Sequence, residues 1–220
     1  DKDNLLKEGS FLLTDQEKEN LTVITDVFEE VVVVLNVSNI IDMSFLEEGT
    51  NDHIKAVLYA WQGGMEGGDA VSEILTGGIT PSGKLTDTIA KEYRFYPSAA
   101  NYDNEDVNFY EEDIYVGYRY FETFCTEAVL YEFGYGLSYT DFSMQVHEAK
   151  VVKAEGQEEI YLYIRVKNEG EQYSGKEVVQ VYFEAPQGKL GRPAKELAAF
   201  AKTKELAPGE EALVHISVPV

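Results

Sequence analysis

Two short runs of uninterrupted apolar residues restrict the fold of this chain more than any other feature of its sequence. Residues 31–35 read Val-Val-Val-Val-Leu, and residues 56–60 read Ala-Val-Leu-Tyr-Ala. Neither run alternates with polar residues, so each is expected to be a strand buried on both faces, as in a parallel sheet covered by helices. The first half of the chain is therefore predicted to have an α/β fold.

Helix signals accompany both runs. The segment 14–17 reads Thr-Asp-Gln-Glu, which is a capping-box pattern, and we expect a helix to begin there. The second run breaks at Gly63 and Gly64, and a helix is expected from about residue 66 or 67 to Leu75. Strand, glycine turn and helix in succession indicate a βαβ arrangement. The segment 84–89 suggests a further short strand.

The second half of the chain has a different pattern. After Ser138, apolar and polar residues alternate, first around 160–166 and then around 179–183, with turn residues between the runs. Short strands at this spacing predict an antiparallel β-sandwich. A seven-strand sandwich needs one or two strands more, so we expect this domain to be truncated at its C-terminus. Between the halves, residues 93–139 are rich in aromatic residues and glycine, which predicts ordered loops packed on a partner surface.

The charge balance excludes two classes of partner. The 220 residues carry 18 basic and 40 acidic side chains, a formal net charge of −22. Such a surface repels phosphate backbones and anionic membranes, so neither a nucleic acid nor a membrane is expected as a partner. No apolar run approaches the ~20 residues that span a bilayer. Cys125 is the single cysteine, which excludes an internal disulfide and favours a reducing compartment, cytoplasmic rather than secreted.

Four motifs, in order along the chain, resemble those of family 3 glycoside hydrolases of the β-glucosidase type. Residues 61–68 read Trp-Gln-Gly-Gly-Met-Glu-Gly-Gly, and residues 80–85 read Thr-Pro-Ser-Gly-Lys-Leu. Residues 113–121 read Asp-Ile-Tyr-Val-Gly-Tyr-Arg-Tyr-Phe, and residues 133–140 read Phe-Gly-Tyr-Gly-Leu-Ser-Tyr-Thr. The combination is specific to this family, although any one glycine-rich piece would be weak.

The resemblance implies an architecture and a reaction. Residues 1–137 would form a three-layer α/β/α sandwich with a mostly parallel sheet, and residues 138–220 an immunoglobulin-like, fibronectin type III-like β-sandwich. Such enzymes hydrolyse terminal β-linked sugars, glucose above all, by a retaining mechanism without a cofactor. Their (β/α)8 barrel carries an Asp nucleophile and is missing here. The fragment would complete the cleft of that barrel and be inactive alone.

The resemblance also bears on the general acid/base. In this family it is commonly a Glu shortly before an Asp-Asn or Asp-Arg pair, and Asp3-Asn4 resembles that pair. The acid/base Glu is therefore expected just before Asp1, so no catalytic residue is assigned within the chain.

Five residues are candidates for binding substrate or lining the cleft. Asn36 and Ser38 follow one predicted strand, Gln62 and Glu66 follow the other, and Asp3 lies near the expected acid/base. In α/β sheets, loops at the carboxyl ends of strands bind ligands. An architectural reading competes: the glycines around Gln62 permit a tight turn, Glu66 favours a helix N-terminus, and Asn36 and Ser38 contact the barrel.

The sequence also bears on two further hypotheses, a metal site and a binding module. His53, His147 and His215 are scattered without paired spacing, so no metal site is expected. A stand-alone carbohydrate-binding or adhesion module is the alternative function. A large exposed apolar patch would favour the truncated enzyme, and a self-contained sugar groove would favour the module.

Overall fold

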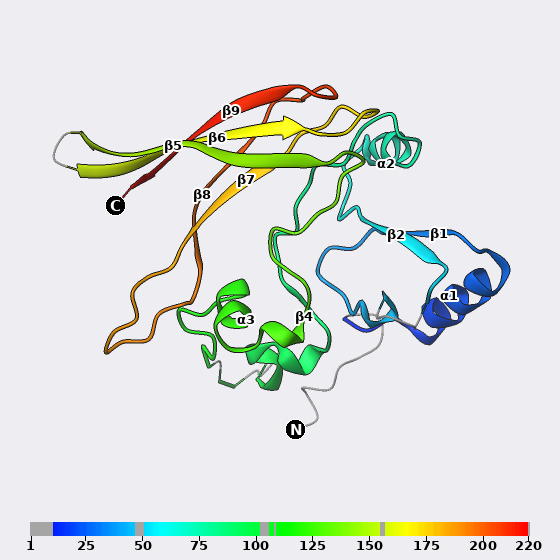
Figure 1. The fold of residues 1–220 in the computed structure, drawn as a ribbon. Helices are drawn as coiled ribbons and strands as arrows, with labels where there is room; N and C mark the ends of the chain where they lie inside the picture. The colour runs from blue at the N-terminus through cyan, green and yellow to red at the C-terminus, as the bar shows by residue number, and fades with distance from the viewer. Residues whose placement is uncertain (1–10, 47–50, 102–105, 108, 155–156, 220) are drawn as a thin grey trace. The chain divides into compact units, whose positions relative to one another are not determined.

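The chain divides into two compact units. The computed structural model describes residues 11–46, 51–101, 106–107, 109–154 and 157–219 (Figure 1). The first unit consists of residues 1–71 and 87–133, and the second of residues 72–86 and 134–220. The domain boundary expected between residues 137 and 138 stays a prediction. No helix in the described ranges is long and apolar enough to cross a membrane.

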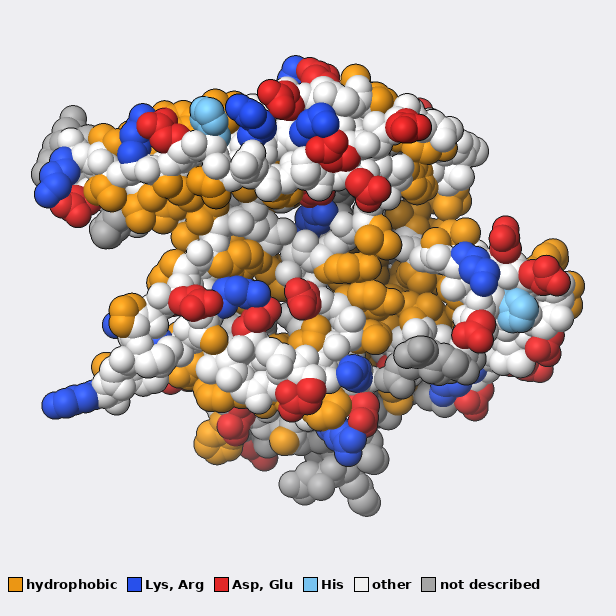
Figure 2. Space-filling view, in the orientation of Figure 1, with side chains coloured by type: hydrophobic (Ala, Val, Ile, Leu, Met, Phe, Trp, Pro, Cys, Tyr) orange, Lys and Arg blue, Asp and Glu red, His pale blue; other side chains and the backbone are white. Residues whose placement is uncertain are grey.

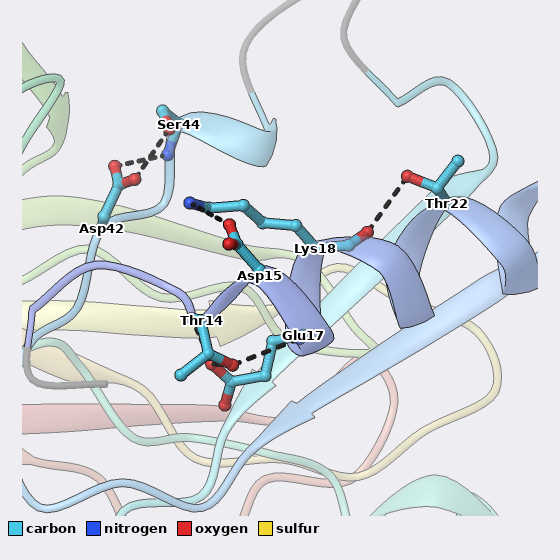
Figure 3. Close-up of polar contacts among 7 residues, drawn as sticks. All are labelled: Thr14, Asp15, Glu17, Lys18, Thr22, Asp42 and Ser44. Atoms are coloured by element: carbon cyan, nitrogen blue, oxygen red, sulfur yellow. Dashed lines mark hydrogen bonds and ion pairs between the residues drawn. The ribbon is translucent and has the colours of Figure 1, made fainter. Parts of the chain in front are cut away.

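Helix α1, Asp15–Val27, begins at the predicted capping box. The backbone N–H of Glu17 donates to the Thr14 hydroxyl at 3.2 Å, and the Thr14 N–H donates to the Glu17 carboxylate at 2.7 Å (Figure 3). These reciprocal bonds satisfy amides that have no partner inside the helix. They also hold the pKa of Glu17 below its usual value, because its carboxylate accepts from the Thr14 backbone and hydroxyl.

A parallel pair of strands follows α1, as the two apolar runs predict. Strand β1, Val31–Leu35, pairs with β2, Ile54–Tyr59, and Leu35 lies opposite Tyr59. The burial of these strands differs from the expectation that both of their faces are covered. Val32 is 52% exposed and Val34 is 38% exposed, so one face of this two-stranded sheet is not fully covered within the first unit. Helix α2, Gly67–Leu75, follows β2 within the predicted range.

Short elements and aromatic packing make up the rest of the first unit. Strand β3, Ile89–Ala90, pairs antiparallel with β4, Val129–Tyr131. A core of Ala90, Phe121 and Ala128 is buried beside them. The other elements are short helices: η2 Ser44–Leu46, η3 Tyr93–Phe95, η4 Pro97–Ala100, α3 Tyr118–Phe124 and η5 Thr126–Ala128.

The second unit is the predicted antiparallel β-sandwich. One sheet has the order β5-β6-β9, formed by Phe142–Ala154, Gln157–Asn168 and Glu211–Pro219. The other pairs β7, Val178–Phe183, with β8, Glu196–Lys202. Their shared core consists of six buried side chains: Ile164, Val166, Val179, Leu206, Val214 and Ile216. The alternating patterns therefore predicted this half of the fold correctly.

A buried asparagine ties the loops at one end of the sandwich. Asn168 is fully buried, and its amide donates to the carbonyls of Tyr173 and Leu206 at 2.9 and 3.0 Å. Its side-chain oxygen accepts from the Thr140 hydroxyl and from the N–H of Gly170. The amide group thus has partners for both its donor and acceptor atoms, as burial of a polar group requires.

Two of the sequence motifs meet in this unit. The Lys84 ammonium lies 2.9 Å from the Glu177 carboxylate and donates to the Gly136 carbonyl at 2.8 Å. The N–H of Leu85 donates to the carbonyl of Tyr135 at 2.7 Å. A Cβ on Gly136 would lie 2.4 Å from the Gly83 carbonyl oxygen, so only glycine allows this approach. The predicted strand at 84–89 is wrong except for Ile89, because these tertiary contacts hold Lys84 and Leu85 outside any sheet.

The capping box generates a stability prediction. Thr14→Ala should lower the free energy of unfolding by about 1 kcal/mol. Thr22→Ala is the matched control, since the Thr22 hydroxyl bonds only the preceding turn, at the Lys18 carbonyl. Urea unfolding followed by circular dichroism measures both; an equal loss in the two variants would contradict the capping role.

The capping box also predicts that the stability of the chain depends on pH. Because the pKa of Glu17 is lowered in the folded state, its stabilising effect is fully present above its unfolded pKa. The effect is lost as the pH falls through the lower, folded pKa. The stability difference between the native chain and its Glu17→Gln variant should therefore shrink in acid, measured by urea unfolding between pH 7 and pH 3.

The Lys84–Glu177 ion pair gives a second stability prediction. Both side chains are largely buried, 18% and 12% exposed, so Lys84→Met removes the ammonium that lies 2.9 Å from the Glu177 carboxylate and should cost roughly 3 kcal/mol. The exposed pair Lys204–Glu210 is the control, and Lys204→Met should cost less than about 1 kcal/mol. Similar losses in both variants would refute the structural role given to Lys84.

Candidate functional site

The candidate site lies where β1 and β2 end. The two strands are parallel and Leu35 lies opposite Tyr59, so both carboxyl ends are at the same edge of the sheet. The N–H of Ala60 donates to the carbonyl of Leu35 at 2.9 Å, so the pairing continues to the point where the strands end. The structure therefore places the segments that carry Asn36 and Gln62 beside each other. Both side chains are exposed.

Ser38 and Glu66 lie farther along the same two loops. Both side chains are exposed, and Glu66 directly precedes α2. The carbonyl of Glu66 accepts from the N–H of Ala70 at 3.1 Å, which is the first hydrogen bond of that helix. A carboxylate at this position is favoured by the helix dipole, so its architectural reading still competes with a ligand-binding role. The fifth candidate, Asp3, lies outside the described residues.

An unusual backbone conformation follows β2. Trp61 has a φ of 53°, which is uncommon for a residue with a large side chain. Its ring packs on that of Tyr59 with 4.4 Å between centroids. The Tyr59 hydroxyl donates to the Asn39 carbonyl at 2.8 Å and so links the two loops. Strained backbone angles of this kind occur most often at functional sites. The strain is identified only by the angle in the structure, because no feature of the sequence predicts it.

Tyr59 stays protonated over the whole physiological range. Burial raises the pKa of Tyr59 to about 12, because the phenolate would lose its hydration, and the nearby Asp87 carboxylate adds to the effect. The hydroxyl is therefore a permanent donor. The bond between the β1 and β2 loops does not depend on pH in the range where proteins are usually studied.

The glycines after Trp61 are not equivalent. A Cβ on Gly63 would lie 3.0 Å from the Cα of Gly67, a tight contact that favours glycine in this turn. A Cβ on Gly64, Gly67 or Gly68 would meet nothing within 4 Å. None of these three has a positive φ. The fold of the described chain thus explains one glycine of the four and leaves an open, unhindered backbone at the other three.

The side chains at this edge are suited to hydrogen bonding. Asn36, Ser38, Gln62 and Glu66 offer donors and acceptors suited to hydroxyl groups. Across the described ranges, no group of three or more His, Cys, Asp or Glu side chains is arranged to hold a metal ion. The other motif residues that sequence analysis singled out, around Lys84 and Gly136, belong to the second unit, where Lys84 pairs with Glu177.

Comparison with known proteins gives consistent matches along the chain. The Glycosyl hydrolase family 3 C-terminal domain matches residues 3–139, and the Fibronectin type III-like domain matches residues 177–220. A β-glucosidase of Ruminococcus albus is 49% identical over 99% of this chain, which covers 22% of that protein. β-Glucosidase A of Butyrivibrio fibrisolvens is 44% identical over 97% of this chain, and the match covers 27% of that protein.

Solved structures agree with the sequence matches. A β-glucosidase from Paenibacillus barengoltzii superposes with a TM-score of 0.94 at 52% identity, over 99% of this chain and 24% of that one. β-Glucosidase 3B from Thermotoga neapolitana, in complex with glucose, superposes with a TM-score of 0.85 at 38% identity. The match covers 97% of this chain and 30% of that one. These matches confirm the α/β and fibronectin-like fold classes. The chain spans about a quarter of the length of the curated relatives it matches.

The contrast among the glycines gives a testable prediction. Gly63→Ala should lower the free energy of unfolding by roughly 1–2 kcal/mol, because its methyl group would press on the Gly67 backbone. Gly68→Ala, inside α2 with open space around it, should be neutral or stabilising by up to about 1 kcal/mol. Chemical denaturation of both variants checks this; a neutral Gly63→Ala would contradict the tight turn.

Proposed function

The chain belongs to glycoside hydrolase family 3, and from that premise we propose that the whole protein is a β-glucosidase-type hydrolase. It removes terminal β-linked sugars by a retaining mechanism and needs no cofactor. The observation that carries the proposal is the similarity to β-glucosidases along 99% and 97% of this chain, while the chain covers only 22% and 27% of them. The remainder of such a protein holds the barrel.

The role of this chain would be to complete the cleft of that barrel. Exposed apolar surface on the first unit supports a large partner. On α1, Val27 and Phe28 at its C-terminal end are 70% and 60% exposed, and on β1 both Val32 and Val34 face outward. Large exposed apolar patches on a protein surface commonly mark an interaction site. The rest of the same protein would cover it.

The aromatic segment of the first unit supports the same conclusion. Phe109 and Tyr110 are 59% and 88% exposed, and Val116 and Phe124 are more than half exposed. Sequence analysis predicted that residues 93–139 pack on a partner surface. Exposed rings are also used by carbohydrate-binding modules, but the aliphatic side chains of α1 and β1 have no use in sugar stacking. Burial against another part of the protein explains both the exposed aromatic rings and the exposed aliphatic side chains.

The catalytic carboxylates would come from outside the 220 residues. A retaining glycosidase needs two carboxyl groups about 5–5.5 Å apart, one to attack the anomeric carbon and one to protonate the leaving oxygen. We assign the nucleophile to an Asp of the barrel and the acid/base to a Glu before Asp1. Adjacent pairs such as Glu29-Glu30 are exposed and belong to the solvated surface.

Within this chain, Asn36, Ser38, Gln62 and Glu66 would line the cleft. The open backbone at Gly64, Gly67 and Gly68 supports this role. Glycine lowers helix and loop stability relative to alanine, and at these three positions no contact of the described chain requires it. Close approach of a sugar or of the barrel backbone to this turn would account for all three.

Hydrolysis of 4-nitrophenyl β-D-glucoside tests the proposal. The complete gene product should release nitrophenol, and the 220-residue chain alone should not exceed the buffer blank. Mixing the chain with the separately expressed remainder of the protein should restore turnover. Turnover by the chain alone would contradict the assignment of both carboxylates to the missing part, and a complete protein inactive on every β-glycoside offered would refute the enzymatic proposal.

Substitutions in the complete protein test the site residues. Gln62→Ala and Glu66→Gln should each raise KM roughly 3- to 10-fold, since a hydrogen bond contributes about 0.5–1.5 kcal/mol. Glu73→Gln is the control, because Glu73 is exposed on α2 away from the turn. Unchanged KM in both site variants, with a lower unfolding temperature, would favour the architectural reading.

A further inference from the structure

The loop that follows β1 is exposed between two buried anchors. Residues 36–40 are mostly exposed, whereas the side chains of Leu35 and Ile41 on either side of them are 8% and 7% exposed. Figure 2 shows acidic and basic side chains of the described residues intermixed on the visible face. Charge therefore does not single out the site on that face, and the contacts that hold its two loops carry more information.

A side chain of β2 holds the middle of this loop. The Tyr59 hydroxyl donates to the carbonyl of Asn39 at 2.8 Å. Within the described ranges, residues 36–40 make no other hydrogen bond to β2 or to the turn that follows it. Burial raises the pKa of Tyr59 to about 12, so the hydroxyl stays a donor and the bond persists at physiological pH.

The ring of the same tyrosine supports the turn after β2. The Trp61 ring packs on the Tyr59 ring with 4.4 Å between centroids, and Trp61 has a φ of 53°, a conformation that favours glycine. Within residues 61–68, none of the glycines has a positive φ. The left-handed residue of this turn is thus a tryptophan, and such a conformation persists only where the surroundings hold it.

Tyr59 makes both contacts from a fixed position. It lies opposite Leu35 in the parallel ladder, and the N–H of Ala60 donates to the Leu35 carbonyl at 2.9 Å. The Tyr59 side chain is partly buried. Because the strand pairing does not involve the tyrosine side chain, loss of the hydroxyl or the ring would free one or both loops without breaking the sheet.

We propose that Tyr59 is the positioning residue of the candidate site. Its hydroxyl fixes the loop that carries Asn36 and Ser38, and its ring fixes the turn that carries Gln62 and Glu66. The two sets of hydrogen-bonding side chains then bind one sugar together, and their ordering is completed on folding rather than on binding. The inference rests on the proposed function, because it takes the ligand to be the terminal sugar of a β-glycoside.

A second tyrosine provides the matched control. The Tyr139 hydroxyl donates to the carbonyl of Ile74 at 2.8 Å, and its ring packs on that of Tyr173. These residues belong to the second unit and carry none of the candidate side chains. Tyr59→Phe and Tyr139→Phe each remove one hydroxyl that bonds a backbone carbonyl and keep the ring, so a purely structural role would give both variants the same phenotype.

Kinetics of the complete gene product on 4-nitrophenyl β-D-glucoside separate the two roles. Tyr59→Phe should raise KM roughly 3- to 10-fold, as expected for one lost hydrogen bond. Its kcat should change less than about twofold, because misaligned loops weaken ground-state and transition-state binding alike. Tyr59→Leu, which also removes the ring beneath Trp61, should raise KM further, and Tyr139→Phe should leave KM unchanged. A KM that moves no more in Tyr59→Phe than in Tyr139→Phe would overturn the proposal.

Amide hydrogen exchange of the same variants needs no activity. Tyr59→Phe should speed exchange roughly 3- to 10-fold across residues 36–43, where the N–H of Asp42 donates to the Phe11 carbonyl. It should leave residues 60–66 unchanged, whereas Tyr59→Leu should speed both segments. Unchanged exchange of residues 36–43 in Tyr59→Phe would also overturn the positioning role. An inactive complete protein with the expected exchange pattern would instead refute the proposed function, while Tyr59 would still hold both loops.

Discussion

A parallel pair of strands needs cover on both faces, and the organisation of the first unit depends on this requirement. Strand β1 is apolar throughout, and β2 is apolar except for Lys55, yet Val32 and Val34 remain exposed on one face. The second unit likewise leaves apolar side chains exposed on β5, namely Met144, Val146 and Val151. Both units therefore have apolar surface that the described chain does not bury. This surface, more than any single polar residue, indicates that the chain functions within a larger protein.

The family motifs separate into two groups once the contacts are known. Gly83, Lys84 and Gly136 hold the second unit together, through an ion pair, a backbone approach and hydrogen bonds that link distant segments. Gly64, Gly67 and Gly68 have no such contacts. A motif residue explained by its neighbours is structural, whereas one left unexplained directs attention to a partner or ligand. On this reasoning we propose that the turn after β2 is the part of the chain that faces the cleft.

Local rules predicted much of the fold from the sequence. The capping box located the start of α1, the two apolar runs located β1 and β2, and alternation identified the sandwich. Tertiary effects could not be predicted in this way. Lys84 was expected in a strand, but its ion pair with Glu177, 93 positions away in the printed sequence, holds it in a loop. The positive φ of Trp61 likewise depends on packing against Tyr59 and has no local signal.

The claim that the rest of the protein covers the first unit can be measured directly by amide hydrogen exchange. The amides of α1 and β1 should exchange at least about tenfold more slowly in the complete gene product than in the 220-residue chain, because burial suppresses local opening. Equal exchange of α1 and β1 in the two proteins would mean that nothing covers these residues, and it would contradict the view of this chain as one part of a larger glycoside hydrolase.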